Sequence, residues 1–159
     1  MKDLTLQIDI KIYEYNELSD ADRELMDAAR EATKRSYAPY SHFSVGAAAR
    51  LADGTIVTGT NQENAAYPSG LCAERTTLFY ANSQYPDQPV ETLAIAARNE
   101  RDFLDEPIPP CGACRQVMLE TEKRFKQPMR ILLYGKKGIY EMKSVGTLLP
   151  LSFDASSME

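Results

Sequence analysis

The first residues of the chain alternate between apolar and polar side chains. Leucine or isoleucine occupies every even position from Leu4 to Ile12, and polar or charged residues occupy the odd positions between them. Successive side chains of a β-strand point to opposite faces of its sheet, so a strict period of two is typical of a strand with one buried face. We therefore expect residues 4–12 to form such a strand.

A helical pattern follows. Ser19 stands before a run with acidic residues in its first turn. This predicts a helix start, because a serine side chain can cap a free backbone N–H and acids favour the positive end of a helix. The helix should run to about Ser36 and end ahead of Pro39, since the residue before proline disfavours helical dihedrals. Its expected buried face repeats at helical spacing: Leu25, Ala29 and Ala32.

The rest of the chain continues this alternation of strands and helices. An Asp53-Gly54 turn signal separates two predicted strands, residues 45–51 and 55–60, which favours a hairpin. The predicted strands cover residues 45–51, 55–60, 91–98, 130–134 and 139–145, and the predicted helices cover residues 72–82 and 111–125. This order favours one sheet with helices on its faces, an α/β sandwich. The length of 159 residues suits a single domain over 1–159.

Charge and composition exclude several classes of protein. The formal net charge is -5 and the basic residues are scattered. Nucleic-acid binders normally carry a basic stripe that neutralises phosphates, so a polynucleotide partner is disfavoured. No apolar run approaches the roughly 18 residues that span a bilayer. The first 15 residues contain acids and lack a signal peptide's apolar core, so we expect a cytoplasmic protein.

The three cysteines suggest a metal centre. Cys111 and Cys114 form a C-x-x-C at the start of one predicted helix, and Cys72 lies at the start of another. Helix N-termini stabilise thiolates, because their free N–H groups and dipole offer positive potential. Three protein ligands around zinc leave the fourth tetrahedral position open, which indicates a catalytic rather than a structural ion.

Two charged residues follow Cys72 in sequence. Glu74 can take a proton from an attacking water and return it to a substrate, as the non-ligand glutamate of zinc deaminases does. Three thiolates give a Zn²⁺ site a net charge of about -1, which weakens its effect on water. Arg75 is the candidate to compensate, by donating hydrogen bonds to the thiolates.

Other readings of the cysteines explain fewer residues. A redox dithiol leaves Cys72 and Glu74 without a role. A closed structural zinc site needs a fourth ligand, and the single histidine, His42, lies far away in sequence. His42 is therefore interpreted as a surface residue. A zinc-binding assembly module without turnover stays open as a function from a different class.

Several ordered blocks of the sequence resemble the small, homotetrameric cytidine deaminases. The resemblance covers roughly residues 20–154. The blocks are Tyr40-Ser41-His42-Phe43-Ser44-Val45-Gly46-Ala47-Ala48, Asn61-Gln62-Glu63-Asn64-Ala65-Ala66-Tyr67, Cys72-Ala73-Glu74-Arg75-Thr76, Pro110-Cys111-Gly112-Ala113-Cys114-Arg115-Gln116-Val117 and Leu148-Leu149-Pro150. The resemblance implies a three-layer α/β/α sandwich around a mixed five-stranded sheet. Residues 1–18 would then be an N-terminal extension that adds an extra strand or covers a subunit interface.

The resemblance also implies contacts with a nucleoside. Asn61 and Glu63 would bind the ribose 3′-hydroxyl, and Phe43 would pack on the pyrimidine ring. The remaining implied contacts are the 5′-hydroxyl with Ala65 and Tyr67, the base carbonyl with the Ala73 N–H, the departing amine with the carbonyl of Pro109, and a neighbouring subunit's pocket with Phe153. The family usually has serine at position 109, but proline keeps the carbonyl that makes the contact.

On this resemblance we expect one Zn²⁺ per subunit and hydrolytic deamination of cytidine and 2′-deoxycytidine in pyrimidine salvage. The product would be the uridine nucleoside plus ammonia, and the protein would be a homotetramer with shared active sites. A deaminase of a cytosine-containing antibiotic such as blasticidin S is the alternative within the enzyme class. Asn61 and Glu63 favour the nucleoside because an amide and a carboxylate suit a sugar diol. A polynucleotide-editing deaminase is disfavoured by the net charge of -5.

Overall fold

A computed structural model describes residues 1–158 of the chain. One mixed sheet of six strands runs through it in the order β1-β6-β5-β4-β2-β3. The strands are β1 (Lys11–Tyr13), β2 (Ser44–Leu51), β3 (Ile56–Thr60), β4 (Val90–Arg98), β5 (Arg130–Gly135) and β6 (Gly138–Met142). Only β4 and β5 pair in parallel, and every other neighbouring pair is antiparallel.

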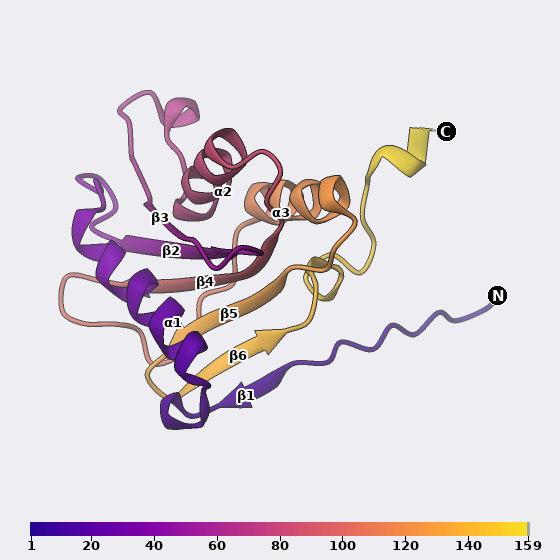
Figure 1. Cartoon of the computed structure of the whole chain (residues 1–159), viewed down its shortest axis with the longest axis horizontal. Coiled ribbons are helices and arrows are strands. Elements are labelled where there is room, and N and C mark those ends of the chain that lie inside the picture. The colour runs from indigo at the N-terminus through magenta and orange to yellow at the C-terminus, as the bar shows by residue number, and fades with distance from the viewer. Residues whose placement is uncertain (159) are drawn as a thin grey trace.

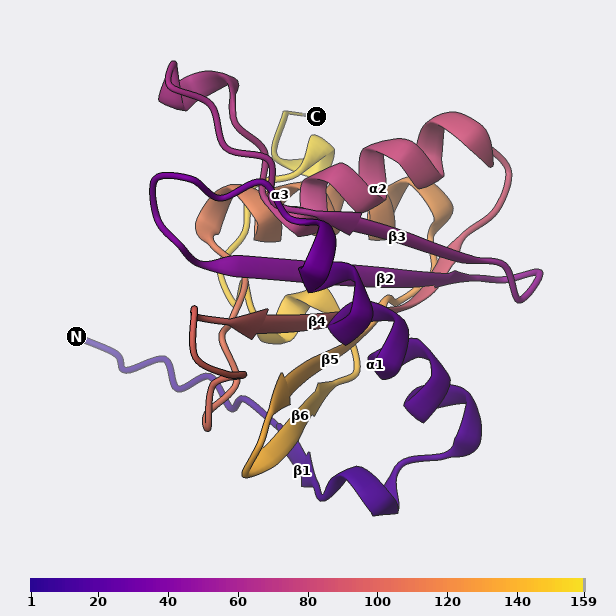
Figure 2. The same cartoon turned by 90° about the vertical axis from the view of Figure 1, so that its left-hand side faces the viewer.

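Within residues 1–158, three α-helices cover this sheet in two layers. They are α1 (Asp20–Ala32), α2 (Ala73–Gln84) and α3 (Gly112–Phe125). Helix α1 lies on one face, and α2 and α3 lie side by side on the other (Figures 1 and 2). The expected three-layer sandwich, five core strands with one extra N-terminal strand, is confirmed. None of the helices in the described part of the chain is both long and apolar enough to cross a membrane.

The core lies on both faces of the central strands. Leu93 and Ile95 of β4 point toward α2 and α3, and Ala94 and Ala96 between them point toward α1. All four residues are at most 3% exposed. Continuous apolar runs of this kind are expected of central strands buried on both faces.

Helix α1 begins and packs as its sequence predicts. The Ser19 side chain accepts a hydrogen bond from the Asp22 N–H at 3.2 Å, which caps the helix. The predicted buried face, Leu25, Ala29 and Ala32, is fully buried. The helix lies so close to β2 that a Cβ on Gly46 would come within 2.1 Å of the Ala29 carbonyl oxygen. Residues 33–35, which we expected to be α-helical, form a 3₁₀ turn instead.

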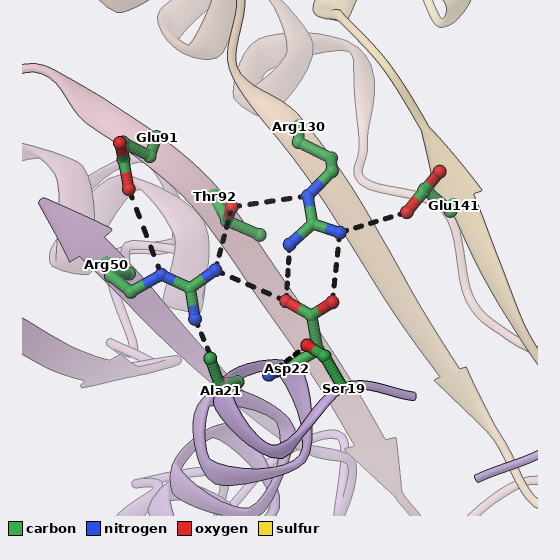
Figure 3. Close-up of polar contacts among 8 residues, drawn as sticks. All are labelled: Ser19, Ala21, Asp22, Arg50, Glu91, Thr92, Arg130 and Glu141. Atoms are coloured by element: carbon green, nitrogen blue, oxygen red, sulfur yellow. Dashed lines mark hydrogen bonds and ion pairs between the residues drawn. The ribbon is translucent and has the colours of Figure 1, made fainter. Parts of the chain in front are cut away.

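A buried carboxylate ties α1 to the sheet (Figure 3). Asp22 accepts hydrogen bonds from Arg50 of β2 at 3.2 Å and from Arg130 of β5, whose guanidinium also donates to Glu141 of β6 at 3.0 Å. Burial favours the neutral acid, but these hydrogen bonds outweigh it, so the pKa of Asp22 lies below its ordinary value. The cluster joins three strands to the first turn of one helix.

The N-terminal strand is much shorter than predicted, and the prediction of a buried face was wrong. Only residues 11–13 pair with the sheet, and the apolar side chains from Leu4 to Ile12 are 44–78% exposed. The register sets Lys11 opposite Glu141, so residues 4–9 would need partners beyond Met142, where β6 ends. The chain there turns into a 3₁₀ segment, Val145–Thr147, and offers no strand edge.

Candidate active site

The three cysteines meet where two helices begin. Cys72 is the N-cap of α2 and Cys111 is the N-cap of α3, and Cys114 lies in the first turn of α3. The three sulfur atoms lie within 4.8 Å of one another. The predicted cluster at two helix N-termini is present. Because α2 and α3 pack side by side on the same face of the sheet, the fold itself brings together residues that are 39 positions apart.

The spacing of the sulfurs suits a tetrahedral zinc site. A Zn–S bond is about 2.3 Å long, so two sulfurs on a tetrahedral zinc lie about 3.8 Å apart. Cys72 Sγ and Cys111 Sγ are 3.8 Å apart. No histidine or carboxylate completes a fourth ligand within the cluster found in the described residues. The donor set is therefore three sulfurs with one position left for a solvent molecule or a substrate, as a catalytic zinc site requires.

Arg75 lies beside the sulfurs, in the first turn of α2. Its guanidinium donates to Cys72 Sγ at 3.5 Å. Hydrogen bonds from Cys114 and Arg75 lower the pKa of the Cys72 thiol to about 5, so Cys72 favours the thiolate that binds metal. The Arg75 guanidinium therefore lies within hydrogen-bond distance of a metal-binding sulfur, the position expected of a group that offsets thiolate charge.

Glu74 is buried next to the cluster. The residue is 5% exposed, and it sits in the same helical turn as Arg75. Burial raises the pKa of its carboxyl, and the negative charge of Cys72 raises the pKa further. A buried carboxyl with a raised pKa takes up a proton more readily than an exposed one, which suits a group that accepts a proton and passes it on.

A cavity of about 670 Å³ opens beside Glu74 and the sulfurs. Its size suits a small molecule. Ten of the thirteen residues that the sequence assigned to the site line this cavity: Phe43, Asn61, Glu63, Tyr67, Cys72, Ala73, Glu74, Arg75, Pro109 and Cys111. Four segments that are separate in the sequence thus line a single cavity. The backbone N–H of Ala73 is among the first of α2, where N–H groups lack intrahelical partners.

Asn61 and Glu63 also hold the segment that carries Phe43. Asn61 accepts from the Val45 N–H at 2.8 Å and donates to the Phe43 carbonyl at 2.8 Å. Glu63 accepts from the Tyr40 N–H at 2.9 Å. These bonds brace residues 40–45 from both sides. The two residues expected at the ribose are therefore joined to the residue expected at the base.

Ser41 completes this connection, and sequence reasoning did not single it out. Its hydroxyl donates to Glu63 and accepts from the Phe43 N–H at 3.1 Å. The Ser41 hydroxyl and the Tyr40 N–H lower the pKa of the Glu63 carboxyl, which keeps it anionic. The signal available in the sequence was the position of Ser41 inside the same block as Phe43.

The apolar wall of the cavity was also missed. Val45, Ile95 and Ile108 line it, and the first two lie on β2 and β4. Their strand positions predicted core packing, and nothing in the local pattern distinguishes a core residue from one at the bottom of a cavity.

Two predicted contacts lie away from the cavity of this chain. Ala65 is exposed in the loop after β3, and Phe153 is 59% exposed in the C-terminal tail. The tail runs along α3, where Gln116 donates to the Phe153 carbonyl at 2.9 Å. His42 is on the surface, as expected, with its Nδ1 3.4 Å from Glu100.

Known proteins are similar to this chain in sequence and in fold. Residues 19–127 match the family described as the cytidine and deoxycytidylate deaminase zinc-binding region. The cytidine deaminase of Halalkalibacterium halodurans is 41% identical over 134 residues, covering 84% of this chain and 95% of the relative. The cytidine deaminase of Sporosarcina psychrophila is 39% identical, with 85% and 93% covered.

Solved structures agree with the sequence relatives. The crystal structure of cytidine deaminase from Burkholderia pseudomallei superimposes with a TM-score of 0.70 at 40% identity, covering 82% of this chain and 97% of that one. The enzyme from Mycobacterium tuberculosis gives a TM-score of 0.66 at 33% identity, with 86% and 98% covered. With the sulfur cluster, the buried glutamate and the cavity on the same face of the same fold, the chain belongs to the zinc-binding cytidine and deoxycytidylate deaminase family.

Proposed function

We propose that this protein catalyses the hydrolytic deamination of cytidine and 2′-deoxycytidine to uridine and 2′-deoxyuridine, with release of ammonia. The observation that carries the proposal is the buried Glu74 beside three sulfurs able to hold zinc, in the lining of a cavity of about 670 Å³ that suits a small molecule. Relatives at 39–41% identity that carry the name cytidine deaminase support the nucleoside over an antibiotic as the substrate. The reaction converts cytosine nucleosides into uracil nucleosides that can be used again, so we propose a role in pyrimidine salvage.

The chain's residues divide the chemistry among them. When bound to Cys72, Cys111 and Cys114, zinc lowers the pKa of a water toward about 7 and so supplies hydroxide near neutral pH. Glu74 takes the proton from the attacking water and delivers it to ring N3, which makes C4 electrophilic. The water oxygen adds to C4, and Glu74 passes the proton of the resulting hydroxyl to the amine, so the C4–N bond breaks, ammonia leaves and C4 becomes a carbonyl. The Pro109 carbonyl accepts a hydrogen bond from the departing amine.

Other residues of the cavity lining position the substrate. Phe43 packs on the pyrimidine, and the Ala73 N–H donates to the base carbonyl. Asn61 and Glu63 bind the 3′-hydroxyl while they brace the segment that carries Phe43. This double use links sugar recognition to base stacking, because a shift in either residue moves the Phe43 backbone.

The active site is completed by assembly into a homotetramer. Ala65 and Phe153 are exposed and lie outside the cavity of their own chain, so their contacts go to a neighbouring subunit. Exposed apolar side chains near the cavity mouth support burial by a partner: Tyr40 at 48%, Tyr67 at 75% and Ile108 at 39%. We further propose that residues 1–159 act as one domain in the cytoplasm.

One assay tests the substrate. The zinc-loaded protein is incubated with cytidine, 2′-deoxycytidine, blasticidin S and a cytosine-containing single strand, and the loss of ultraviolet absorbance is followed for each. Turnover of the two nucleosides alone is expected. Turnover of blasticidin S with none of cytidine would make the protein an antibiotic deaminase, and turnover of none with full zinc content would make it a binding module.

Glu74→Gln tests the proton route. The amide keeps the shape of the side chain and removes its ability to exchange protons, so zinc content should stay at one per subunit while deamination is lost. Glu120→Gln, an exposed position on α3, is the matched control and should retain full turnover. Deamination at the parent rate by Glu74→Gln would falsify the assignment of Glu74.

A further inference from the structure

The N-terminal segment, residues 3–10, has an apolar face that nothing in the described chain covers. Leu4, Leu6, Ile8 and Ile10 are 78%, 47%, 51% and 44% exposed. The segment runs away from the body of the molecule in an extended path (Figure 1). No backbone hydrogen bond joins it to any other part of the described residues. An unpaired extended segment with alternating apolar residues is a template for another strand.

The segment continues an edge of the sheet. Strand β1 is outermost in the sheet, so one of its edges pairs with β6 and the other is free. A strand that pairs with residues 3–11 on this free side would extend the sheet without disturbing any existing pair.

We propose that this segment binds the same segment of a second copy of the chain, as two antiparallel strands related by a twofold axis at Gln7. Symmetry supplies the first constraint. Side chains directly opposite in an antiparallel pair lie on the same face. An axis that passes through a residue position therefore sets even positions against even ones, and the two apolar faces coincide.

Charge selects the register centred on Gln7. In that register Asp3 of each copy is opposite Lys11 of the other, so two pairs of opposite charges form. A register centred on Leu6 sets Asp3 opposite Asp9, and one centred on Asp9 sets the two Asp9 side chains opposite each other. Like charges directly opposite destabilise a strand pair, and opposite charges stabilise it.

The remaining registers satisfy fewer groups. An axis at Ile8 sets Lys11 opposite the uncharged Thr5. An axis at Ile10 sets Asp9 opposite Lys11 but leaves Asp3, Leu4 and Leu6 opposite positions beyond Tyr13, where β1 ends. Only the Gln7 register combines the pair of Asp3 and Lys11 with Leu4 opposite Ile10 and Leu6 opposite Ile8. The two sheets then join edge to edge through their β1 strands, which pairs the backbone groups of the segment and sets the apolar side chains of the two copies side by side on one face.

Cysteine cross-linking tests the register on the full, zinc-loaded chain. In the proposed pair residue 7 faces itself, at a Cα separation of about 4.5–5.5 Å, which suits a disulfide. Gln7→Cys should give a covalent dimer on mild oxidation. Thr5→Cys and Asp9→Cys face each other's positions and not themselves, so each alone should give none. The unmodified chain measures the background from its three native cysteines.

The outcome decides between a defined pair and a loose tail. Absence of the dimer in Gln7→Cys would overturn the proposal. Equal dimer at positions 5, 7 and 9 would overturn it as well, because a mobile tail cross-links at every position.

Two lysine substitutions in the Gln7→Cys background test the charge pairing. Asp3→Lys sets lysine against Lys11 and should reduce the dimer yield. Thr5→Lys sets lysine against Asp9 and should raise the yield. Both changes make the segment more positive and both lie on its polar face, so a general charge effect would move the two yields in the same direction. That result would refute the register.

Discussion

Replacing Asp22 with asparagine removes the negative charge around which the buried cluster of Figure 3 is built. The Asp22 side chain is 10% exposed, and Arg130 and Arg50 both donate to it. Asparagine keeps the size of the side chain, but its amide group offers one acceptor oxygen in place of two and carries no charge. Arg130 would keep Glu141 as a partner, and Arg50 would keep the Ala21 carbonyl.

The expected cost follows from these partners. Removing one member of a buried ion pair costs about 3–5 kcal/mol, because the other charge stays buried without compensation. Here each arginine retains a second acceptor, and the Arg130 side chain is 29% exposed. The loss should therefore lie at the lower end of this range, and we expect the free energy of unfolding to fall by about 3 kcal/mol. For a chain of this length that corresponds to a Tm lower by roughly 10 °C.

The stabilisation of the folded chain by Asp22 depends on pH. The pKa of Asp22 is lower in the folded chain than its ordinary value, so its stabilisation is present above the unfolded pKa. It is lost as the pH falls below about 4 and the carboxylate takes up a proton. Parent and Asp22→Asn should therefore differ at neutral pH and converge in acid. Loss of zinc in acid affects both chains alike, so the difference between them is the quantity to follow.

Urea unfolding, followed by circular dichroism across this pH range, measures the difference. Glu31→Gln is the matched control on the same helix, where Glu31 and its partner Lys34 are both more than 60% exposed. That change should cost no more than about 0.5 kcal/mol. An Asp22→Asn difference as small as the control's, or one that is unchanged in acid, would refute the role of the charge.

Three further predictions concern the site and its support. Arg75→Gln should lower zinc content or cytidine turnover about tenfold or more, because loss of a group that holds metal ligands has effects of that size; unchanged values of both would exclude its role in offsetting thiolate charge. Ser41→Ala should raise the KM for cytidine several-fold with a smaller effect on kcat, and Ser41→Thr should restore the KM, since the hydroxyl joins Glu63 to Phe43; steady-state kinetics checks both. Gly46→Ala should lower the Tm, because its Cβ would collide with the Ala29 carbonyl, and an unchanged melting curve would show that α1 can move away from β2.

Local signals in the sequence predicted most of the elements and the chemical centre. The capping serine, the helical repeat of Leu25, Ala29 and Ala32, and the turn at Asp53-Gly54 act over a few residues, so they can be interpreted without a fold. The cysteines were informative for the same reason, since their position at helix starts is a local property. Their meeting across two helices depended on the fold, which the family resemblance supplied.

Features that depend on distant partners were not predictable in this way. The pairing of Asp22 with Arg130 joins positions 108 residues apart, and nothing near either residue indicates it. Alternation over residues 4–12 correctly indicated an extended segment with two different faces, but it contains no information on whether a partner strand exists. In this chain β6 ends at Met142, so the predicted strand is paired only over its last residues.

The site combines two kinds of structural support, and this has a consequence for its specificity. Glu74 and the cysteines stand on the first turns of α2 and α3, which are packed against the core, so the chemical groups are held rigidly. Asn61, Glu63 and Phe43 come from loops and strand ends that are partly exposed. A few hydrogen bonds hold them together, directly between Asn61 and Phe43 and through Ser41 between Glu63 and Phe43. Changes in the loops can therefore alter which substrate binds while the proton chemistry stays intact. Substitutions at the loop positions should change KM ratios between nucleosides, whereas substitutions at the helix starts should remove turnover of all substrates together.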